Sequence, residues 1–346
     1  MTRAPGPCEL PVGTKRRDYE ICSVLGGGQT SLVYQAYDTM LNRYVAVKEY
    51  LPVAFAVRDD RLQLTVLPGK QEAFESGLRR FVAEARIMTA FDHCALRRSY
   101  QFFQEAGSAY IVMPYYPGKT LRAAVYEGWR IGNISDLFMI TLPLLEGLST
   151  IHQANYCHCG VSPDNILIQN NSEPILLDFG AIQRPGEFFG ERPVSALAPG
   201  FAALEQYGID RNVCIGAWTD VYAISAVIYH AVTGIVPEPA TARVVRDTLR
   251  PLAGFTVADL PVRLLEAIDQ GLSVAPQVRF ASIEAFANAL DQSVQAAMAT
   301  PNRPTGAAVS DILSVAATVS SYSPRIRRLL QLTSALRDRI RQRGAG

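Results

Sequence analysis

The sequence predicts an α+β protein with two lobes, a small strand-rich lobe followed by a larger helical one. Short runs in which apolar and β-branched residues alternate dominate the first third of the 346-residue chain, which is the pattern of strands. Beyond Tyr116-Pro117-Gly118 the apolar residues recur at helical spacing instead. Strands followed by helices are typical of a domain in which the two types of element segregate.

The bulk composition limits the possible functions. Apolar residues make up 49% of the chain, enough for a large core, and the formal net charge is +1. Such a balance gives no general attraction to nucleic acid, so no nucleic-acid partner is expected. There is no run of 18 apolar residues and no apolar stretch in the opening MTRAPGPCEL, so neither a transmembrane span nor a signal peptide is expected. Six scattered cysteines favour a reducing compartment, and we expect a cytoplasmic location.

The first lobe is predicted element by element. Residues 1–17 are rich in proline, glycine and basic side chains, and we expect a flexible lead-in there. Residues 51–70 carry charges and prolines and are interpreted as an insertion. A helix at 72–91 follows, with Phe81, Ala85 and Met88 on one face. Strands are predicted at 19–25, 31–36, 44–49, 100–103 and 109–113.

The remainder of the chain is predicted to be helical. Helices are expected at 136–154, 219–233, 260–272 and 281–298. Residues 299–346 are interpreted as a linker and a basic amphipathic helical tail, with an arginine-rich stripe at 325–343. Two interpretations of this tail stay open. It docks on an acidic protein partner or an anionic membrane surface, or it packs on the body of the protein with solvated arginines.

Three glycines stand between two predicted strands, in Leu25-Gly26-Gly27-Gly28-Gln29. A glycine-rich hairpin lets backbone N–H groups approach a phosphate closely. A dinucleotide-binding loop would instead lead from a strand into a helix. Taken alone, the run is more typical of a flexible hairpin than of a nucleotide site.

A lysine and a glutamate follow this hairpin at positions suited to holding phosphate. Lys48 ends the apolar strand Val45-Ala46-Val47, and Glu84 lies on the predicted helix. An ion pair between them would fix the ammonium toward a phosphate. Taken singly, the two residues are also what a strand end and an exposed helix surface usually carry.

The order of these motifs resembles that of bacterial-type serine/threonine protein kinases over residues 19–292. The match continues with Leu176-Leu177-Asp178-Phe179-Gly180, with the loop Cys157–Asn165, and with Gly200–Tyr207. The resemblance implies the two-lobed kinase fold, with ATP and Mg²⁺ as cofactors. It implies a kinase-like domain at 18–298, made of an N-lobe at 18–113, a hinge at 114–118 and a C-lobe at 119–298.

The resemblance also implies roles for individual residues. Asn165 and Asp178 match the metal-binding asparagine and aspartate of the family. Structural roles fall to His158 of the catalytic loop, to Asp220, which anchors that loop, and to the pair Glu205 and Arg279. The ATP-binding positions are Gly26, Gly27, Gly28, Val33, Ala46, Lys48, Glu84, Met113, Tyr115, Tyr116 and Leu167.

The catalytic loop departs from the family pattern His-Arg-Asp-Leu-Lys-Pro-x-Asn. Here the arginine is Cys159, the aspartate that accepts the substrate proton is Gly160, and the lysine is Ser162. The hydroxyl residue that normally bonds these groups is Ala198. No intact set of catalytic residues is therefore expected. A metal or redox site at Cys157-His158-Cys159 is an alternative with little support, since the family pattern already explains the histidine.

These departures predict a pseudokinase that binds ATP and Mg²⁺ and acts as a regulatory or scaffolding module for a protein partner. The basic C-terminal helix is the candidate docking element. One alternative is an active serine/threonine kinase that transfers the γ-phosphate through a non-standard loop. Another is a scaffold that binds no nucleotide.

Overall fold

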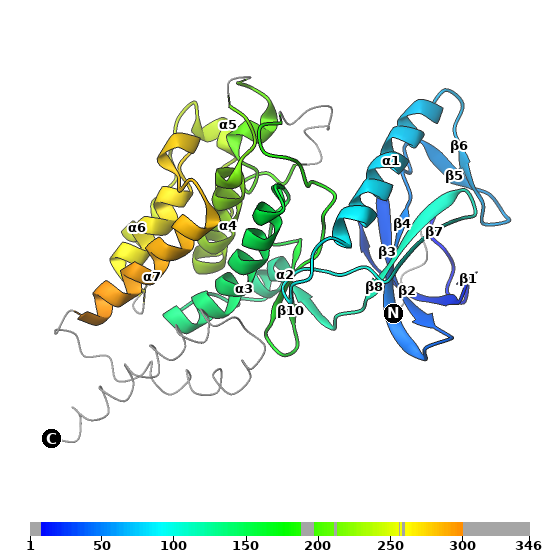
Figure 1. The fold of residues 1–346 in the computed structure, drawn as a ribbon, viewed down its shortest axis with the longest axis horizontal. Coiled ribbons are helices and arrows are strands. Elements are labelled where there is room, and N and C mark those ends of the chain that lie inside the picture. Colours follow the sequence, from blue (N-terminus) through cyan, green and yellow to red (C-terminus); the bar gives the residue numbers. More distant parts are fainter. Residues whose placement is uncertain (1–7, 188–196, 211–212, 256, 258–259, 300–346) are drawn as a thin grey trace, which may run out of the picture. The chain divides into compact units, whose positions relative to one another are not determined.

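The computed structural model describes residues 8–187, 197–210, 213–255, 257 and 260–299, which divide into two compact units (Figure 1). The first unit contains the chain up to Pro117 together with Asp178–Gly180. The second contains Gly118–Leu177 and the residues from Ala181 onward. The predicted α+β plan is confirmed, because the first unit is built on a sheet and the second on helices.

A six-stranded antiparallel sheet in the order β1-β2-β3-β4-β8-β7 forms the body of the first unit. Alternate residues of β3 and β4, among them Tyr34, Ala36, Val45 and Val47, lie in one buried cluster, as the two-residue period of a strand requires. All five strands predicted here are confirmed. The strands are β1 (Lys15–Arg16), β2 (Tyr19–Gly27), β3 (Ser31–Asp38), β4 (Arg43–Tyr50), β7 (Gln101–Glu105) and β8 (Ser108–Pro114).

Residues 8–17, the described part of the lead-in predicted at 1–17, are attached to the sheet and do not form the flexible segment that composition suggested. Leu10 is buried in the core beside the sheet, and β1 pairs with β2. Arg16 donates from Nε to the Tyr110 hydroxyl at 3.1 Å and from Nη2 to the Leu62 carbonyl at 2.8 Å. One apolar residue and one arginine thus attach residues 8–17 to the sheet through partners distant in sequence.

The predicted insertion at 51–70 forms an antiparallel pair, β5 (Ala56–Arg58) and β6 (Leu64–Val66). Arg58 donates to the buried Glu49 carboxylate at 2.8 Å, which ties the pair to β4. Helix α1 (Gln71–Met88) follows and confirms the helix predicted at 72–91. Its Phe74 and Phe81 rings lie 5.1 and 5.7 Å from the Tyr50 ring, measured between centroids.

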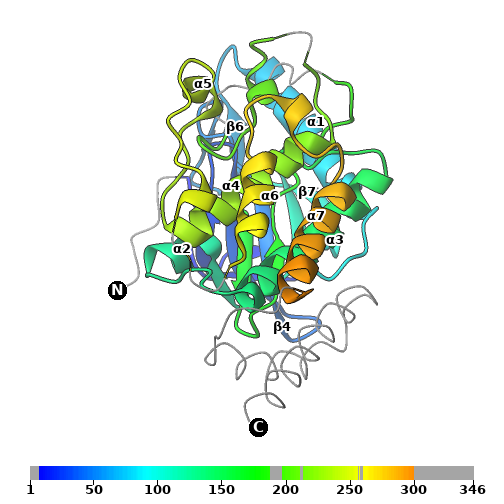
Figure 2. The same cartoon turned by 90° about the vertical axis from the view of Figure 1, so that its left-hand side faces the viewer.

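Helix α4 (Ala217–Thr233) is the central helix of the second unit and contacts three other long helices (Figure 2). Its residues from Thr219 to Ala231 are all buried, as expected of a predominantly apolar helix in the core. Together these four elements confirm the four predicted helices. The three neighbours are α3 (Ile134–Gln153), α6 (Val262–Gly271) and α7 (Ile283–Ala299).

Shorter elements of the second unit were not predicted, because periodicity needs more residues than they contain. Three of them form a sheet in the order β11-β10-β9, and the catalytic loop leads directly into its central strand, β10. These elements are α2 (Leu121–Tyr126), α5 (Ala240–Arg243), β9 (Gly118–Thr120), β10 (Ile166–Gln169), β11 (Pro174–Leu176) and the 3-10 turns η2 (Leu204–Tyr207), η3 (Leu252–Gly254) and η4 (Pro276–Val278).

One described helix, α3, is long and apolar enough to cross a bilayer by length and composition. Its most apolar window is 61% buried inside the fold, and a core helix passes the same test, so α3 is no clear membrane span. The tail predicted at 299–346, including the arginine-rich helix, lies outside the described residues except for the last residue of α7.

Candidate active site

The glycine run forms a tight hairpin between β2 and β3, as predicted, and not a strand-to-helix turn. The Gly28 N–H donates to the Ser31 carbonyl at 2.9 Å and closes the turn. A Cβ on Gly27 would lie 2.5 Å from Leu32 Cδ1, so a side chain there would collide with β3. A Cβ on Gly26 or Gly28 would meet open space, and both positions are exposed, so the backbone of this hairpin is accessible to a ligand.

Lys48, Glu84 and Asp178 form a charged cluster in the first unit. Lys48 donates from Nζ to both Glu84 oxygens, at 2.7 and 3.0 Å, and to Asp178 Oδ1 at 2.8 Å. The Gly180 N–H donates to the same Asp178 oxygen at 3.1 Å. The structure therefore brings together the lysine, glutamate and aspartate that the sequence analysis assigned to phosphate and metal binding.

The electrostatics of this cluster keep Lys48 and Asp178 charged. Burial works against the Lys48 charge, but Asp178 and Glu84 outweigh it and raise the Lys48 pKa. Burial likewise opposes the Asp178 charge, yet Lys48 and Arg97 hold its pKa well below the usual range. Burial, reinforced by Asp178, raises the pKa of Glu84. An ammonium held between two carboxylates is suited to gripping phosphate oxygens.

Arg97, between α1 and β7, is a further member of the cluster that the sequence analysis did not identify. Its side chain is 7% exposed, and Nη2 lies 3.6 Å from Glu84 Oε1. The neighbouring Arg98 is 55% exposed and pairs with Asp92. Nothing in the sequence distinguishes the two arginines, because which one turns inward depends on the packing of α1 against the sheet.

The residues expected to contact adenine are distributed over both units. In the first unit, Val33 pairs with Lys48 across β3 and β4, and Ala46 pairs with Met113 across β4 and β8. Tyr115 and Tyr116 follow β8 and are both half-buried. In the second unit, Leu167 lies on β10 between its partners on β9 and β11. Their contacts with a nucleotide stay a prediction.

The backbone of the catalytic loop is held by Asp220, which is fully buried on α4. Its carboxylate accepts hydrogen bonds from the His158 N–H at 2.7 Å and the Cys159 N–H at 2.8 Å. These bonds hold Cys159 at a φ of +58°, a conformation that side chains other than glycine adopt rarely. Asn165 donates from its side-chain amide to the Gly160 carbonyl at 2.8 Å, which closes the loop.

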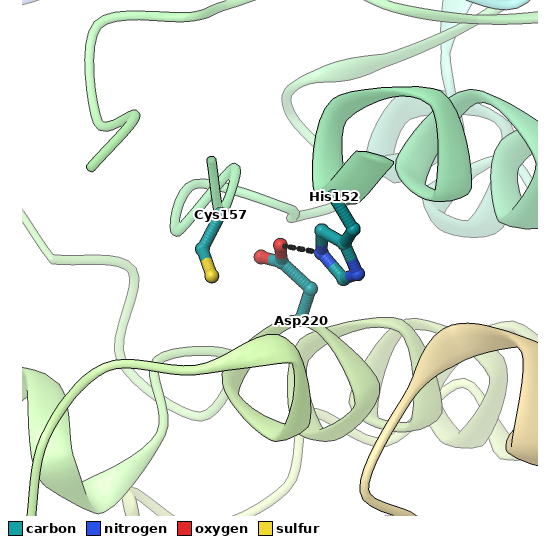
Figure 3. Close-up of side chains that lie close together, drawn as sticks. All are labelled: His152, Cys157 and Asp220. Atoms are coloured by element: carbon teal, nitrogen blue, oxygen red, sulfur yellow. Dashed lines mark hydrogen bonds and ion pairs between the residues drawn. The ribbon is translucent and has the colours of Figure 1, made fainter. Parts of the chain in front are cut away.

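A histidine and a cysteine also lie beside the Asp220 carboxylate (Figure 3). His152 Nε2 lies 2.8 Å from Asp220 Oδ2, and the Cys157 thiol completes a group whose ligand atoms lie within 4.8 Å of one another. Both Asp220 oxygens already accept backbone N–H groups, and burial and the nearby carboxylate raise the Cys157 pKa. A protonated thiol and an occupied carboxylate are poor metal ligands, so we interpret the group as an anchor.

The positions at which the kinase pattern led us to expect missing catalytic groups carry small or apolar residues and are closely packed. Cys159 is 5% exposed and packs in an apolar cluster with Leu197, Ala202 and Ile215. A Cβ on Gly160 would lie 3.0 Å from Ala181 Cβ. Ser162 is buried, and Ala198 offers only its backbone, whose carbonyl accepts from two N–H groups of the following turn.

A buried ion pair between Glu205 and Arg279 supports the segment after the catalytic loop. Arg279 Nη1 and Nη2 donate to Glu205 at 2.8 and 3.2 Å, and both side chains are fully buried. The Thr219 hydroxyl donates to Glu205 at 2.7 Å, and Arg279 also donates to the carbonyls of Ser273 and Val274. The structure thus forms the structural pair that the sequence analysis expected.

A model of the protein kinase domain family matches residues 19–256. The chain belongs to the protein kinase family. The solved structure of PpkA-294 in its apo form superposes on this kinase with a TM-score of 0.73 and 33% sequence identity. The match covers 82% of this chain and 99% of that one, which confirms the predicted two-lobed fold.

Curated relatives of this chain are bacterial serine/threonine-protein kinases. The serine/threonine-protein kinase PknD of Chlamydia abortus is 23% identical over 309 residues, which cover 80% of this chain and 31% of that protein. PknL of Mycobacterium tuberculosis is 26% identical over 219 residues, which cover 63% of this chain and 50% of that protein. This chain therefore matches half or less of the length of these two relatives.

The kinase family implies ATP and Mg²⁺, and the residues present fit that chemistry. The Asp178 contacts use Oδ1, while 43% of the side chain stays exposed, so the carboxylate can still take a cation. Asn165 uses its amide nitrogen as a donor, which leaves the amide oxygen as a ligand. Carboxylate and amide oxygens are the ligands that Mg²⁺ prefers.

Proposed function

We propose that this protein is a pseudokinase, which binds ATP and Mg²⁺ through its kinase fold and transfers the γ-phosphate weakly or not at all. Its bound form would regulate or scaffold a protein partner in the cytoplasm. The observation that carries this proposal is the lack of a usable carboxylate in the catalytic loop. Gly160 has no side chain, and Ala181 occupies the space beside it.

Asp164 is the one carboxylate within residues 157–165, and its contacts argue against a substitute role. Arg122 of α2 donates to Asp164 Oδ1 at 2.6 Å, and both side chains are partly exposed. A general base must reach the hydroxyl that it deprotonates, with an oxygen free to accept the proton. Asp164 Oδ1 is already engaged by the Arg122 guanidinium, so this oxygen would have to leave its ion pair to reach a substrate hydroxyl.

The expected loss of rate is large but finite. A general base contributes roughly 10²–10⁴ in rate, about 3–5 kcal/mol. A charged hydrogen bond to the γ-phosphate contributes about 1.5–3 kcal/mol more. Together these amount to about 4–8 kcal/mol, or roughly 10³–10⁶ in rate. Because phosphoryl transfer depends mainly on positioning and metal electrostatics, slow autophosphorylation is compatible with the proposal.

Nucleotide binding is tested by thermal unfolding of the full chain with ATP and Mg²⁺, because a ligand that binds the folded state raises its stability. We expect a shift that Lys48→Ala abolishes and that Lys119→Ala, a change to an exposed lysine on β9, leaves intact. A wild-type protein without any shift would favour the scaffold that binds no nucleotide. A shift that Lys48→Ala leaves unchanged would mean that ATP binds elsewhere.

Phosphate transfer is tested separately, with labelled ATP offered to the protein itself and to a generic protein substrate. We expect incorporation at or near background. Robust turnover that Asp178→Ala abolishes would overturn the pseudokinase assignment and favour the active kinase with a non-standard loop. Turnover that survives Asp178→Ala would point to a contaminating kinase in the preparation.

A further inference from the structure

The charged cluster of the first unit contains a second cation, Arg97, in addition to the lysine that is proposed to bind phosphate. Lys48 alone contacts both Glu84 and Asp178 by hydrogen bonds. Arg97 adds a second positive charge 3.6 Å from Glu84, and its field also acts on Asp178. With Arg97 the four groups sum to zero formal charge, and without it they would sum to one negative charge.

The geometry of Arg97 is unusual for a purely structural arginine. Its Nε and Nη2 atoms are shut off from solvent and have no hydrogen-bond partner among the described residues. Burying two guanidinium nitrogens without hydrogen bonds costs stability, and an apolar side chain of similar length would avoid that cost. By contrast, the fully buried Arg279 satisfies its guanidinium with a carboxylate and three carbonyls. Arg97 therefore contributes its positive charge to the cluster, and its Nε and Nη2 atoms contribute no hydrogen bonds.

We propose that Arg97 supplies a fixed positive charge beside Glu84 and Asp178, so that ATP binds this protein with little dependence on a divalent cation. This inference rests on the proposed function, in which Lys48 holds the phosphates. A triphosphate approaching one lysine and two carboxylates meets a net negative site, and a divalent cation ordinarily reverses that sign. Here the buried guanidinium makes the site neutral before any cation binds.

The size of the effect follows from Coulomb attraction in a partly buried site. One unit charge several ångströms from a phosphate, at an effective dielectric constant near 20, changes an affinity by about tenfold or more. Because Nε and Nη2 are inaccessible, we assign the effect to the field of Arg97 and not to a direct contact of these atoms with ATP. Mg²⁺ can still bind at Asp178, but it adds little to the affinity for ATP.

The experiment titrates ATP into the full chain by calorimetry, once with excess EDTA and once with MgCl₂. For the wild type we expect the two affinities to agree within about tenfold. In Arg97→Met the affinity without metal should fall by about tenfold, while the affinity with Mg²⁺ falls less. Arg97→Lys keeps the charge and should behave as the wild type. Arg98→Met is the matched control, because that arginine is adjacent and 55% exposed.

Two results of this titration would overturn the proposal. One is a wild-type protein that binds ATP only with Mg²⁺, a result that needs no variant. The other is an Arg97→Met protein, shown to be folded by circular dichroism, whose two affinities match those of Arg98→Met.

A second arm uses Mn²⁺ alone, without nucleotide, and follows free Mn²⁺ by electron paramagnetic resonance. Removing the positive charge should make Arg97→Met bind Mn²⁺ about tenfold more tightly than the wild type or Arg98→Met. Equal Mn²⁺ binding in all three proteins would contradict the role of Arg97. If no variant binds ATP under any condition, the proposed function fails, and the Mn²⁺ arm still decides the charge role separately.

Discussion

The two units differ in which residues of the kinase pattern they carry. In the first unit the charged cluster contains the lysine, the glutamate and the aspartate of the kinase pattern, and Lys48 contacts both Glu84 and Asp178. In the catalytic loop of the second unit, Asp220 and Asn165 still hold the backbone, while Gly160 and Ser162 stand where the family has its reactive groups. The loop keeps the residues that shape it and lacks the ones that react.

This difference teaches that loop geometry and loop chemistry are separable. The N–H groups of His158 and Cys159 are buried, and a buried N–H without a partner is costly, so the fold depends on Asp220 whether or not the loop reacts. A catalytic aspartate or lysine serves only the reaction. We therefore expect its absence to cost the fold little, and here Ala181 lies beside Gly160.

The strongest way to break the comparison is to restore the missing chemistry. If the loop backbone is still shaped for catalysis, Gly160→Asp with Ser162→Lys should raise phosphate transfer from labelled ATP by roughly 10²–10⁴. Since a Cβ at Gly160 would lie 3.0 Å from Ala181 Cβ, we expect the full gain only when Ala181→Gly is added. Single-turnover incorporation of label by the wild type, the double variant and the triple variant measures this gain.

The control for restored activity is Asp178→Ala in the triple variant, which should return incorporation to background. A folded triple variant that binds ATP and still transfers no phosphate would contradict the idea that the loop keeps a catalytic shape. The second unit would then differ from an active kinase in the backbone of its loop as well as in its side chains.

A second test concerns the anchors of the second unit. Arg279→Met leaves Glu205 buried without its guanidinium and should lower the free energy of unfolding by about 3–5 kcal/mol. Urea titration followed by circular dichroism measures the change. Lys119→Met, which breaks an exposed ion pair with Glu127, is the matched control and should cost about 0–1 kcal/mol. Equal losses in both variants would mean that this anchor does not support the unit.

The sequence predicted the elements whose pattern is local. Alternation located the five strands around Lys48, and helical periodicity located α1, α3, α4, α6 and α7, because each contains enough residues to show its period. Motif order then predicted the pair Lys48 and Glu84 and assigned Asp178 to metal binding, and in the structure both carboxylates lie within 3.0 Å of Lys48 Nζ. The pair Glu205 and Arg279 was found in the same way.

Features that depend on packing between distant segments were not predicted. The attachment of residues 8–17 depends on Arg16 meeting Tyr110 and Leu62, and no local pattern encodes those partners. Arg97 is buried and Arg98 is exposed, and this difference depends on how the segment after α1 reaches β7. The approach of Ala181 to the empty side of Gly160 likewise appears only in three dimensions.

The smallest expected effect separates the two units by pH. Burial lowers the pKa of His230, which lies on α4 of the second unit, below its ordinary 6.5. Since the unfolded chain then binds the proton more readily, the stability of the second unit is greatest above about pH 6.5 and falls as the pH drops, by at most about 1.4 kcal/mol per pH unit. In the first unit the group with a lowered pKa is a carboxylate, Asp178, which titrates at a lower pH than a histidine. Its contribution is present above about pH 3.8 and is lost only as the pH falls below that value.

Urea unfolding of the wild type and of His230→Leu between pH 4.5 and 8 tests this assignment. The two proteins should differ in slope between about pH 5 and 6.5 and run parallel above about pH 7. Parallel curves for the wild type and His230→Leu would show that His230 does not set the acid sensitivity of the second unit. The pH profile would then no longer distinguish the anchored unit from the phosphate-holding one.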